Sequence, residues 1–105
     1  MPAFNIVKFR VKPGQDARFL DAHRDGRADW PGLERGVIVK TGERSYCLIG
    51  EWTDGAAIAQ ARGRMIETLN SFRDALEEIG PGLGVTDAAT GPAVLNLKGA
   101  AFESG

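Results

Sequence analysis

The sequence predicts an α+β fold whose elements follow the order β-α-β-β-α-β, and three observations support this order. Residues 4–11 alternate between two faces and are rich in β-forming side chains, which is typical of a strand. Residues 45–54, Ser-Tyr-Cys-Leu-Ile-Gly-Glu-Trp-Thr-Asp, indicate a strand that is apolar on both faces and therefore needs cover on both sides. Residues 54–79 repeat apolar side chains at three- and four-residue steps, as a long amphipathic helix does.

Length and composition indicate one globular domain. The chain has 105 residues, of which 43% are hydrophobic and 26% charged, and its formal net charge is −1. The basic residues are dispersed, which argues against nucleic-acid binding, and no apolar run approaches the roughly 18 residues of a membrane span. Cys47 has no disulfide partner and the N-terminus does not resemble a signal peptide, so we expect a cytoplasmic protein. We expect one domain over residues 1–98 and a tail over 99–105.

The first helix is predicted over residues 15–27, after a turn at Lys12-Pro13-Gly14. Trp30-Pro31-Gly32 ends it, because proline disfavours helical geometry at the residue before it. One stripe along this helix carries Phe19, Ala22, His23, Gly26 and Trp30.

A hairpin is predicted in the middle of the chain. Residues 33–41 form its first strand, residues 41–44 its polar turn and residues 45–54 its second strand, so the two strands are antiparallel. In the first of them, Val37 and Val39 share one face, and Ile38 and Lys40 share the other.

Asp54 is the predicted N-cap of the long helix. Gly63 predicts a kink or a split within that helix, and Gly80-Pro81-Gly82 ends it. Residues 83–91 are predicted to be a loop, and residues 92–97 the fourth strand.

This order of elements is the ferredoxin-like arrangement. Right-handed crossovers place both helices on one face of an antiparallel four-stranded sheet, with the first and third strands in the middle. The predicted helix-facing set is Asn5, Val7, Phe9, Val37, Val39, Tyr46, Leu48, Trp52, Ala93, Leu95 and Leu97. The predicted opposite set is Phe4, Ile6, Lys8, Arg10, Ile38, Lys40, Cys47, Ile49, Glu51, Val94 and Asn96.

The second of these faces has no helix to cover it. Apolar patches of this size mark interaction surfaces, and burying each side chain is worth about 1.5–3 kcal/mol. We therefore expect a homodimer that packs sheet against sheet about a two-fold axis. The alternative is a bent sheet, or a C-terminal tail folded across it. The predicted dimer interface consists of Phe4, Ile6, Ile38, Cys47, Ile49 and Val94.

Over residues 3–98 the chain resembles the antibiotic biosynthesis monooxygenase-like family of dimeric α+β barrel proteins. The resemblance rests on the order of elements, on Pro31-Gly32-Leu33 before the second strand and on Glu51-Trp52-Thr53-Asp54 at the end of the third. It implies a homodimer whose two sheets form the barrel, with a pocket between sheet and helices in each subunit. Some members of the family oxidise polycyclic phenols with molecular oxygen and no cofactor, others degrade heme, and many have no assigned role.

The resemblance favours the cofactor-free members. The heme-degrading branch is similar in having an asparagine where Asn5 stands, but it also carries an iron-ligating histidine on the second helix, and residues 54–80 contain none. The cofactor-free oxygenases surround their substrate with asparagine, tryptophan and in some cases arginine or histidine. Asn5 and Trp52 match these positions, and Trp30 matches more loosely. The resemblance to these members implies no cofactor. We also expect no metal site, because one histidine and one cysteine on different elements make no ligand set.

His23 and Asn5 are the candidate catalytic residues. His23 is the only histidine, and at a pocket its imidazole would act as a base on a phenol or quinol. The alternative is a packing histidine bonded to the backbone. Asn5 is unusual in a strand, and it either orients a carbonyl or dioxygen-derived group or bonds the backbone at a helix end.

Five aromatic residues are the expected ligand-binding set: Phe19, Trp30, Tyr46, Trp52 and Phe72. They either stack on a flat ligand or fill the core. Three hypotheses follow: a cofactor-independent monooxygenase acting on a phenol or quinol, a non-catalytic small-molecule-binding or stress-associated dimeric protein, and a structural dimer with a filled core. A cavity large enough for an aromatic ring separates the first two from the third.

Overall fold

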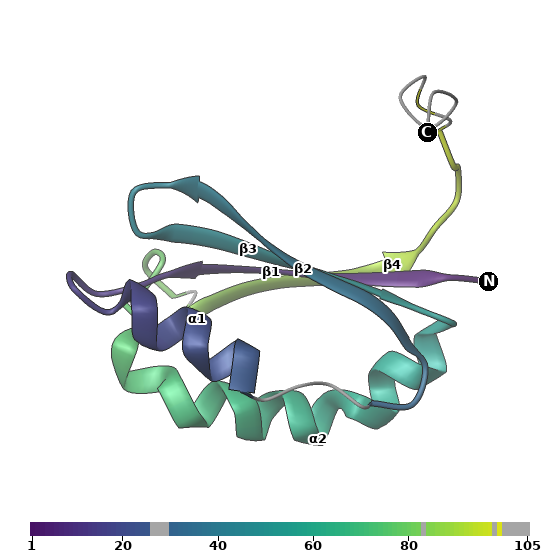
Figure 1. The fold of residues 1–105 in the computed structure, drawn as a ribbon. Helices are drawn as coiled ribbons and strands as arrows, with labels where there is room; N and C mark the ends of the chain where they lie inside the picture. Colours follow the sequence, from purple (N-terminus) through teal and green to yellow (C-terminus); the bar gives the residue numbers. More distant parts are fainter. Residues whose placement is uncertain (26–29, 83, 98, 100–105) are drawn as a thin grey trace.

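The computed structural model describes residues 1–25, 30–82, 84–97 and 99, and it confirms the ferredoxin-like α+β arrangement. Four antiparallel strands form one sheet in the order β2-β3-β1-β4, so the first and third strands are central, as predicted. Both helices lie on the same face of the sheet (Figure 1), and the other face is called the open face below. The elements are β1 (Ala3–Arg10), α1 (Asp16–Asp25), β2 (Leu33–Gly42), β3 (Ser45–Trp52), α2 (Gly55–Phe72), a short 3-10 turn η1 (Arg73–Ala75) and β4 (Thr86–Pro92).

The core between the sheet and the helices forms two clusters. The first is built around Phe9, Phe19 and Phe72, together with Val11, Tyr46 and Leu76. The second is built around Trp52 and Ile58 near the N-terminal end of α2, together with Ala3 and Ala61. Phe19 and Trp52 are almost fully buried, so they anchor α1 and β3 to these clusters.

The prediction for the faces of β2 is wrong by one residue. Ile38 pairs with Leu48, so it lies on the helix face and not on the open face where the dimer interface is predicted. Val37 pairs with Ile49 and Val39 with Cys47, which puts both valines on the open face. The cause is a register shift between Leu33 and Arg35, where β2 uses two residues against one on β3. One extra residue in a strand moves every later side chain to the opposite face.

The fourth strand lies earlier in the chain than predicted. β4 is Thr86–Pro92, which falls largely in the predicted loop, and it pairs along β1 from Phe9↔Thr86 to Ala3↔Pro92. The predicted strand over 92–97 lies beyond the sheet, and that segment leads away from it (Figure 1). The backbone of this segment is joined to the start of the chain by the hydrogen bond from the Ala93 N–H to the Pro2 carbonyl. Val94 follows that bond, and although it was predicted on the open face of a strand, it is 86% exposed.

The long helix is shorter than predicted and is not split. α2 runs from Gly55 through Gly63 to Phe72 without interruption. A single glycine costs about 1 kcal/mol relative to alanine, and the rest of the 18-residue helix offsets this cost. Its predicted N-cap is confirmed: the Ala57 N–H donates to the Asp54 side chain at 2.9 Å. After η1 the chain is extended, and Leu76 bridges to Val11. The predicted helical positions up to residue 79 are therefore wrong beyond the 3-10 turn.

Two sequence predictions fall outside the described residues. They are the last turn of the first helix, residues 26–27, and most of the predicted tail over 99–105. No helix in the described ranges is long and apolar enough to cross a membrane.

Candidate functional site

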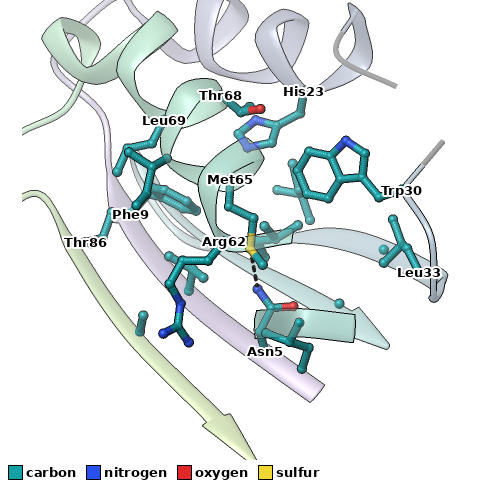
Figure 2. Close-up of a pocket in the computed structure, with 18 of the residues that line it drawn as sticks. Asn5, Phe9, His23, Trp30, Leu33, Arg62, Met65, Thr68, Leu69 and Thr86 are labelled. Carbon is teal, nitrogen blue, oxygen red and sulfur yellow. Dashed lines mark hydrogen bonds between the residues drawn. The ribbon is translucent and has the colours of Figure 1, made fainter. Parts of the chain in front are cut away.

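A cavity of about 850 Å³ lies between the sheet and the helices. This volume is within the range of small-molecule sites, roughly 300–1,000 Å³. All four strands and both helices contribute to its wall, and Figure 2 shows side chains from the helices and the sheet converging on it. Much of the wall is apolar and includes Val7, Leu20, Leu33, Ile38, Leu48, Ile58, Met65, Ile66 and Leu69.

Asn5 is the buried polar residue at the sheet side of this cavity, with 5% of its surface exposed. Its Oδ1 accepts a hydrogen bond of 2.8 Å from the Trp52 indole Nε1–H. Gly50 stands opposite Asn5 in the register and makes this bond feasible: a Cβ at position 50 would lie 2.3 Å from Asn5 Oδ1. The missing side chain of Gly50 therefore leaves the space in which Asn5 and Trp52 meet.

The amide nitrogen of Asn5 is left with a weak partner. Its Nδ2 faces the Met65 thioether sulfur at 3.8 Å across the cavity (Figure 2). Because Trp52 already occupies Oδ1, the orientation of the amide is settled, and the amide N–H groups face the cavity. A thioether is a poor acceptor, so an oxygen atom of a ligand would bind this donor better than Met65 does.

His23 lies on α1 at the cavity wall, half-buried against three phenylalanine rings. Its ring centroid is 4.8 Å from those of Phe19 and Phe72 and 6.0 Å from that of Phe9. Its Nδ1 lies 2.9 Å from the Phe19 carbonyl oxygen, and because a carbonyl only accepts, Nδ1 carries the proton. Burial lowers the pKa of His23 below its ordinary value, against the smaller effect of this hydrogen bond. The ring is therefore neutral at neutral pH, with its lone pair on Nε2.

The five predicted ligand-binding aromatics divide into two groups. Trp30, Trp52 and Phe72 line the cavity, and the two indoles stack with their centroids 6.1 Å apart. Phe19 and Tyr46 do not line it and belong to the core. The centroids of their rings are 5.0 Å apart. The Tyr46 hydroxyl donates a hydrogen bond to the Asp16 carboxylate, and this bond raises the pKa of Tyr46. A ligand in this cavity would touch the first group and not the second.

Several cavity residues were not singled out from the sequence. Met65 belongs to the apolar stripe of α2, and nothing in its spacing marks it as the neighbour of Asn5. Arg62 does carry a signal, since it is a charged residue within the stripe that holds Ile58, Met65 and Leu69. Thr86 and Thr90 were missed because their strand was predicted to be a loop.

Among the described residues, no three histidine, cysteine, aspartate or glutamate side chains gather closely enough to hold a metal ion. Cys47, a free thiol of intermediate exposure, lies on the open face together with Phe4, Ile6 and Ile49. These residues of the predicted interface therefore stand away from the cavity.

The chain was compared with known proteins by sequence and by structure. No protein-family model matches it, and no curated protein matches its sequence. Solved structures do match. SnoaB from Streptomyces nogalater, described as a cofactor-independent oxygenase, is 19% identical with a TM-score of 0.72, over 91% of this chain and 96% of that one.

Two further structures match equally fully. A protein from Chloroflexus aurantiacus, named as a candidate antibiotic biosynthesis monooxygenase, is 13% identical with a TM-score of 0.71, over 93% of this chain and 98% of that one. The fold is that of the antibiotic biosynthesis monooxygenase-like proteins. A Nitrosomonas europaea protein of unknown function is also similar, at 18% identity and a TM-score of 0.68, over 94% of this chain and 95% of that one. At these identities the likeness shows the fold and assigns no role to any residue of the cavity.

Proposed function

We propose that this protein is a small cofactor-independent monooxygenase that oxidises a flat phenol or quinol in the cavity beside Asn5. One observation carries the proposal: a buried amide whose Oδ1 is held by Trp52 presents its Nδ2 to the cavity, where its partner among the described residues is the Met65 thioether. Buried polar groups normally have good partners, and a catalytic role is one recognised explanation for an exception. The fold similarity to SnoaB, described as a cofactor-independent oxygenase, supports the same reaction class.

The residues divide the work as follows. His23 Nε2 removes a proton from the substrate, because burial keeps the ring neutral and Nδ1 is already bonded to the Phe19 carbonyl. Asn5 Nδ2 donates to the oxygen on which negative charge develops, in a position preorganised by the bond to Trp52. Trp30 and Phe72 bound the cavity and hold the ring in place.

The reaction balances with molecular oxygen as the only co-substrate. For a phenol whose ring carries a reactive CH₂ group, such as an anthrone, R₂CH₂ + O₂ gives R₂C=O + H₂O. The carbanion formed on deprotonation combines with O₂ and takes back the proton from His23 to give a hydroperoxide. Loss of water then breaks the O–O bond and the remaining C–H bond. The substrate supplies all the electrons, so no external reductant is required.

Oxygen uptake with dithranol (1,8-dihydroxyanthrone) tests the proposal. We expect the wild-type protein to accelerate uptake over the protein-free rate, with one water formed per anthraquinone. Asn5→Ala and His23→Ala should each lower the rate, since general-base or oxyanion contacts contribute about 10²–10³-fold. Arg64→Gln, on the exposed side of α2, is the matched control and should not change it.

The same experiment separates the enzyme from a binding protein. Binding of dithranol under anaerobic conditions without accelerated uptake in air would favour a non-catalytic small-molecule-binding or stress-associated protein. Absence of both binding and uptake would contradict both ligand-based functions, and with them the assignment of roles to Asn5 and His23.

We also propose that the protein works as a homodimer that packs open face on open face. Ile6, Val37 and Val39 are 37–41% exposed on this face, and Phe4, Cys47 and Ile49 lie among them. Burying such side chains against a second copy would stabilise the pair by about 25 cal/mol for each Å² of apolar surface removed from water. The segment after β4 exposes Val94, Leu95 and Leu97, which a second copy could also cover.

Light scattering of the purified protein checks the dimer. We expect twice the chain mass for the wild type and one chain mass for Val39→Glu, which places a charge in the proposed contact. Ile66→Glu, on α2 and 50% exposed against 41% for Val39, should stay dimeric. A monomeric wild type at micromolar concentration would overturn this part of the proposal.

A further inference from the structure

The charged groups around the cavity are all basic in the described part of the chain. The charged ones are Arg24 and Arg62, His23 is the neutral base described above, and no described aspartate or glutamate lines the cavity. Arg24 is neutralised on its own helix by Asp21, with 2.5 Å between Nη1 and Oδ1. Arg62 forms no ion pair with any described residue. The cavity wall therefore holds a guanidinium group whose charge no described carboxylate balances.

Arg62 is an exposed residue of α2, yet it lies on the stripe of the helix that faces the cavity. It lies four residues after Ile58 and three before Met65, both of which line the cavity, so it belongs to the sheet-facing stripe of the helix. The neighbours at these spacings are Ile58, Ala59, Met65 and Ile66, and none of them carries a carboxylate. Figure 2 shows the guanidinium directed toward the β4 side of the cavity, level with Asn5.

Strand β4 adds hydroxyl groups to this side of the cavity. Its helix-facing row consists of Thr86, Ala88 and Thr90, which pair with Phe9, Val7 and Asn5 of β1, and all three line the cavity. Thr90 stands directly beside Asn5 in the register and is exposed. These small side chains leave room above them, and their hydroxyls can donate to an anion.

The two sides of Asn5 therefore differ in chemistry. Toward β3 and β2 the wall consists of Trp52, Leu48, Ile38 and Leu33, which suit an aromatic ring. Toward β4 it consists of small and hydroxyl-bearing side chains with the Arg62 guanidinium above them (Figure 2). A ligand that fills both sides must be apolar at one end and anionic at the other.

We infer that the preferred substrate is an aromatic carboxylate, whose ring lies on the β3–β2 side and whose carboxylate is bound by Arg62 with the Thr90 hydroxyl. A guanidinium group matches a carboxylate with two parallel N–H···O bonds, and such charge-assisted bonds are stronger than neutral ones. The inference rests on the proposed function for the aromatic ring, and it adds the acidic group and the residue that selects it.

Calorimetric titration with two matched probes tests the inference: 6-hydroxy-2-naphthoic acid and its carboxamide, which has the same shape without the charge. We expect wild-type protein to bind the acid about tenfold or more tightly than the amide, and added salt to weaken only the acid. Arg62→Gln should bind both probes with the wild-type affinity for the amide. Arg64→Gln, an exposed arginine that does not line the cavity, should keep the wild-type preference.

The outcomes separate a failure of the carboxylate from a failure of the aromatic ligand. Equal binding of acid and amide by the wild type overturns the carboxylate, while aromatic binding itself survives. A preference that persists in Arg62→Gln but disappears in Arg24→Gln overturns the assignment to Arg62. Binding of neither probe overturns the inference together with the aromatic ligand of the proposed function. Thermal unfolding of each variant verifies that the fold is intact, so that a lost preference reports on the charge.

Discussion

Gly50 controls the geometry of the site, and replacing it with alanine should disrupt both stability and ligand binding. An added Cβ would lie 2.3 Å from Asn5 Oδ1 and 2.9 Å from Trp52 Nε1. Ordinary van der Waals contact for such a carbon begins near 3.4 Å, so the Asn5 amide or the Trp52 indole must move. Either movement breaks the 2.8 Å hydrogen bond between them, because the two groups are otherwise confined by the buried core.

The expected cost follows from three contributions. Breaking the buried bond leaves polar groups unsatisfied, at about 1–3 kcal/mol. Overpacking of the site costs about 1–3 kcal/mol, and the lower entropy of the unfolded alanine chain offsets roughly 0.5–1 kcal/mol. The middle of these ranges is a net loss of about 3 kcal/mol in the free energy of unfolding, which corresponds to a decrease in Tm of roughly 12–24 °C for a domain of this size.

Gly36→Ala is the matched control for this substitution. Gly36 pairs with Gly50 across β2 and β3, yet a Cβ added there meets no atom within 4 Å. We expect its Tm to stay within about 4 °C of the wild type, because surface changes without a clash stay within about 0.5 kcal/mol. Thermal unfolding followed by circular dichroism at equal protein concentrations measures both variants. A Gly50→Ala protein as stable as Gly36→Ala would refute the reasoning about the Asn5–Trp52 bond.

Three further predictions concern caps and charges. Asp54→Ala removes the acceptor for the Ala57 N–H and should lower the free energy of unfolding in urea by about 1 kcal/mol; no change would mean that the cap contributes nothing. Burial lowers the pKa of His23, so the folded chain binds fewer protons than the unfolded one below the ordinary value of 6.5. The free energy of unfolding is therefore highest above pH 6.5 and decreases as the pH falls toward the lowered pKa of His23. His23→Gln should remove that part of the pH dependence. Because the chain has one histidine, an NMR titration assigns the pKa without ambiguity. The Arg18 guanidinium donates to Asp74 and holds the pKa of that carboxyl below its usual value, so Arg18→Gln should raise it in a carbon-detected NMR titration, and an unchanged pKa would contradict the pairing in solution.

The fold was predictable because its strongest signals are local. Phe4 to Arg10 alternates cleanly, and Asp54 caps a helix whose apolar stripe is long, so neither depends on distant contacts. β4 lacks such a signal: it consists of threonine, aspartate, alanine, glycine and proline, and it forms because β1 offers it a partner along its whole length. Val94 and Leu95 have the composition of a strand without a strand to pair with.

The faces of β2 could not be predicted for a related reason. A single register shift near Leu33 decides whether Ile38 or Val37 points to the helices, and alternation alone does not reveal it. At the site, Asn5 and His23 could be named because their residue types are unusual where they stand. The neighbours that give them chemical meaning, Met65 and the Phe19 carbonyl, become visible only in three dimensions.

Oxygen-isotope labelling tests the central claim most directly. Wild-type protein and dithranol are incubated under ¹⁸O₂ in unlabelled water, and the anthraquinone is analysed by mass spectrometry against protein-free and Asn5→Ala samples. The proposed reaction predicts one ¹⁸O atom in each product molecule, formed faster with the wild type than in either comparison. Product formed no faster than in the protein-free sample, or formed without the label, would contradict the assignment of this cavity as an oxygenase site.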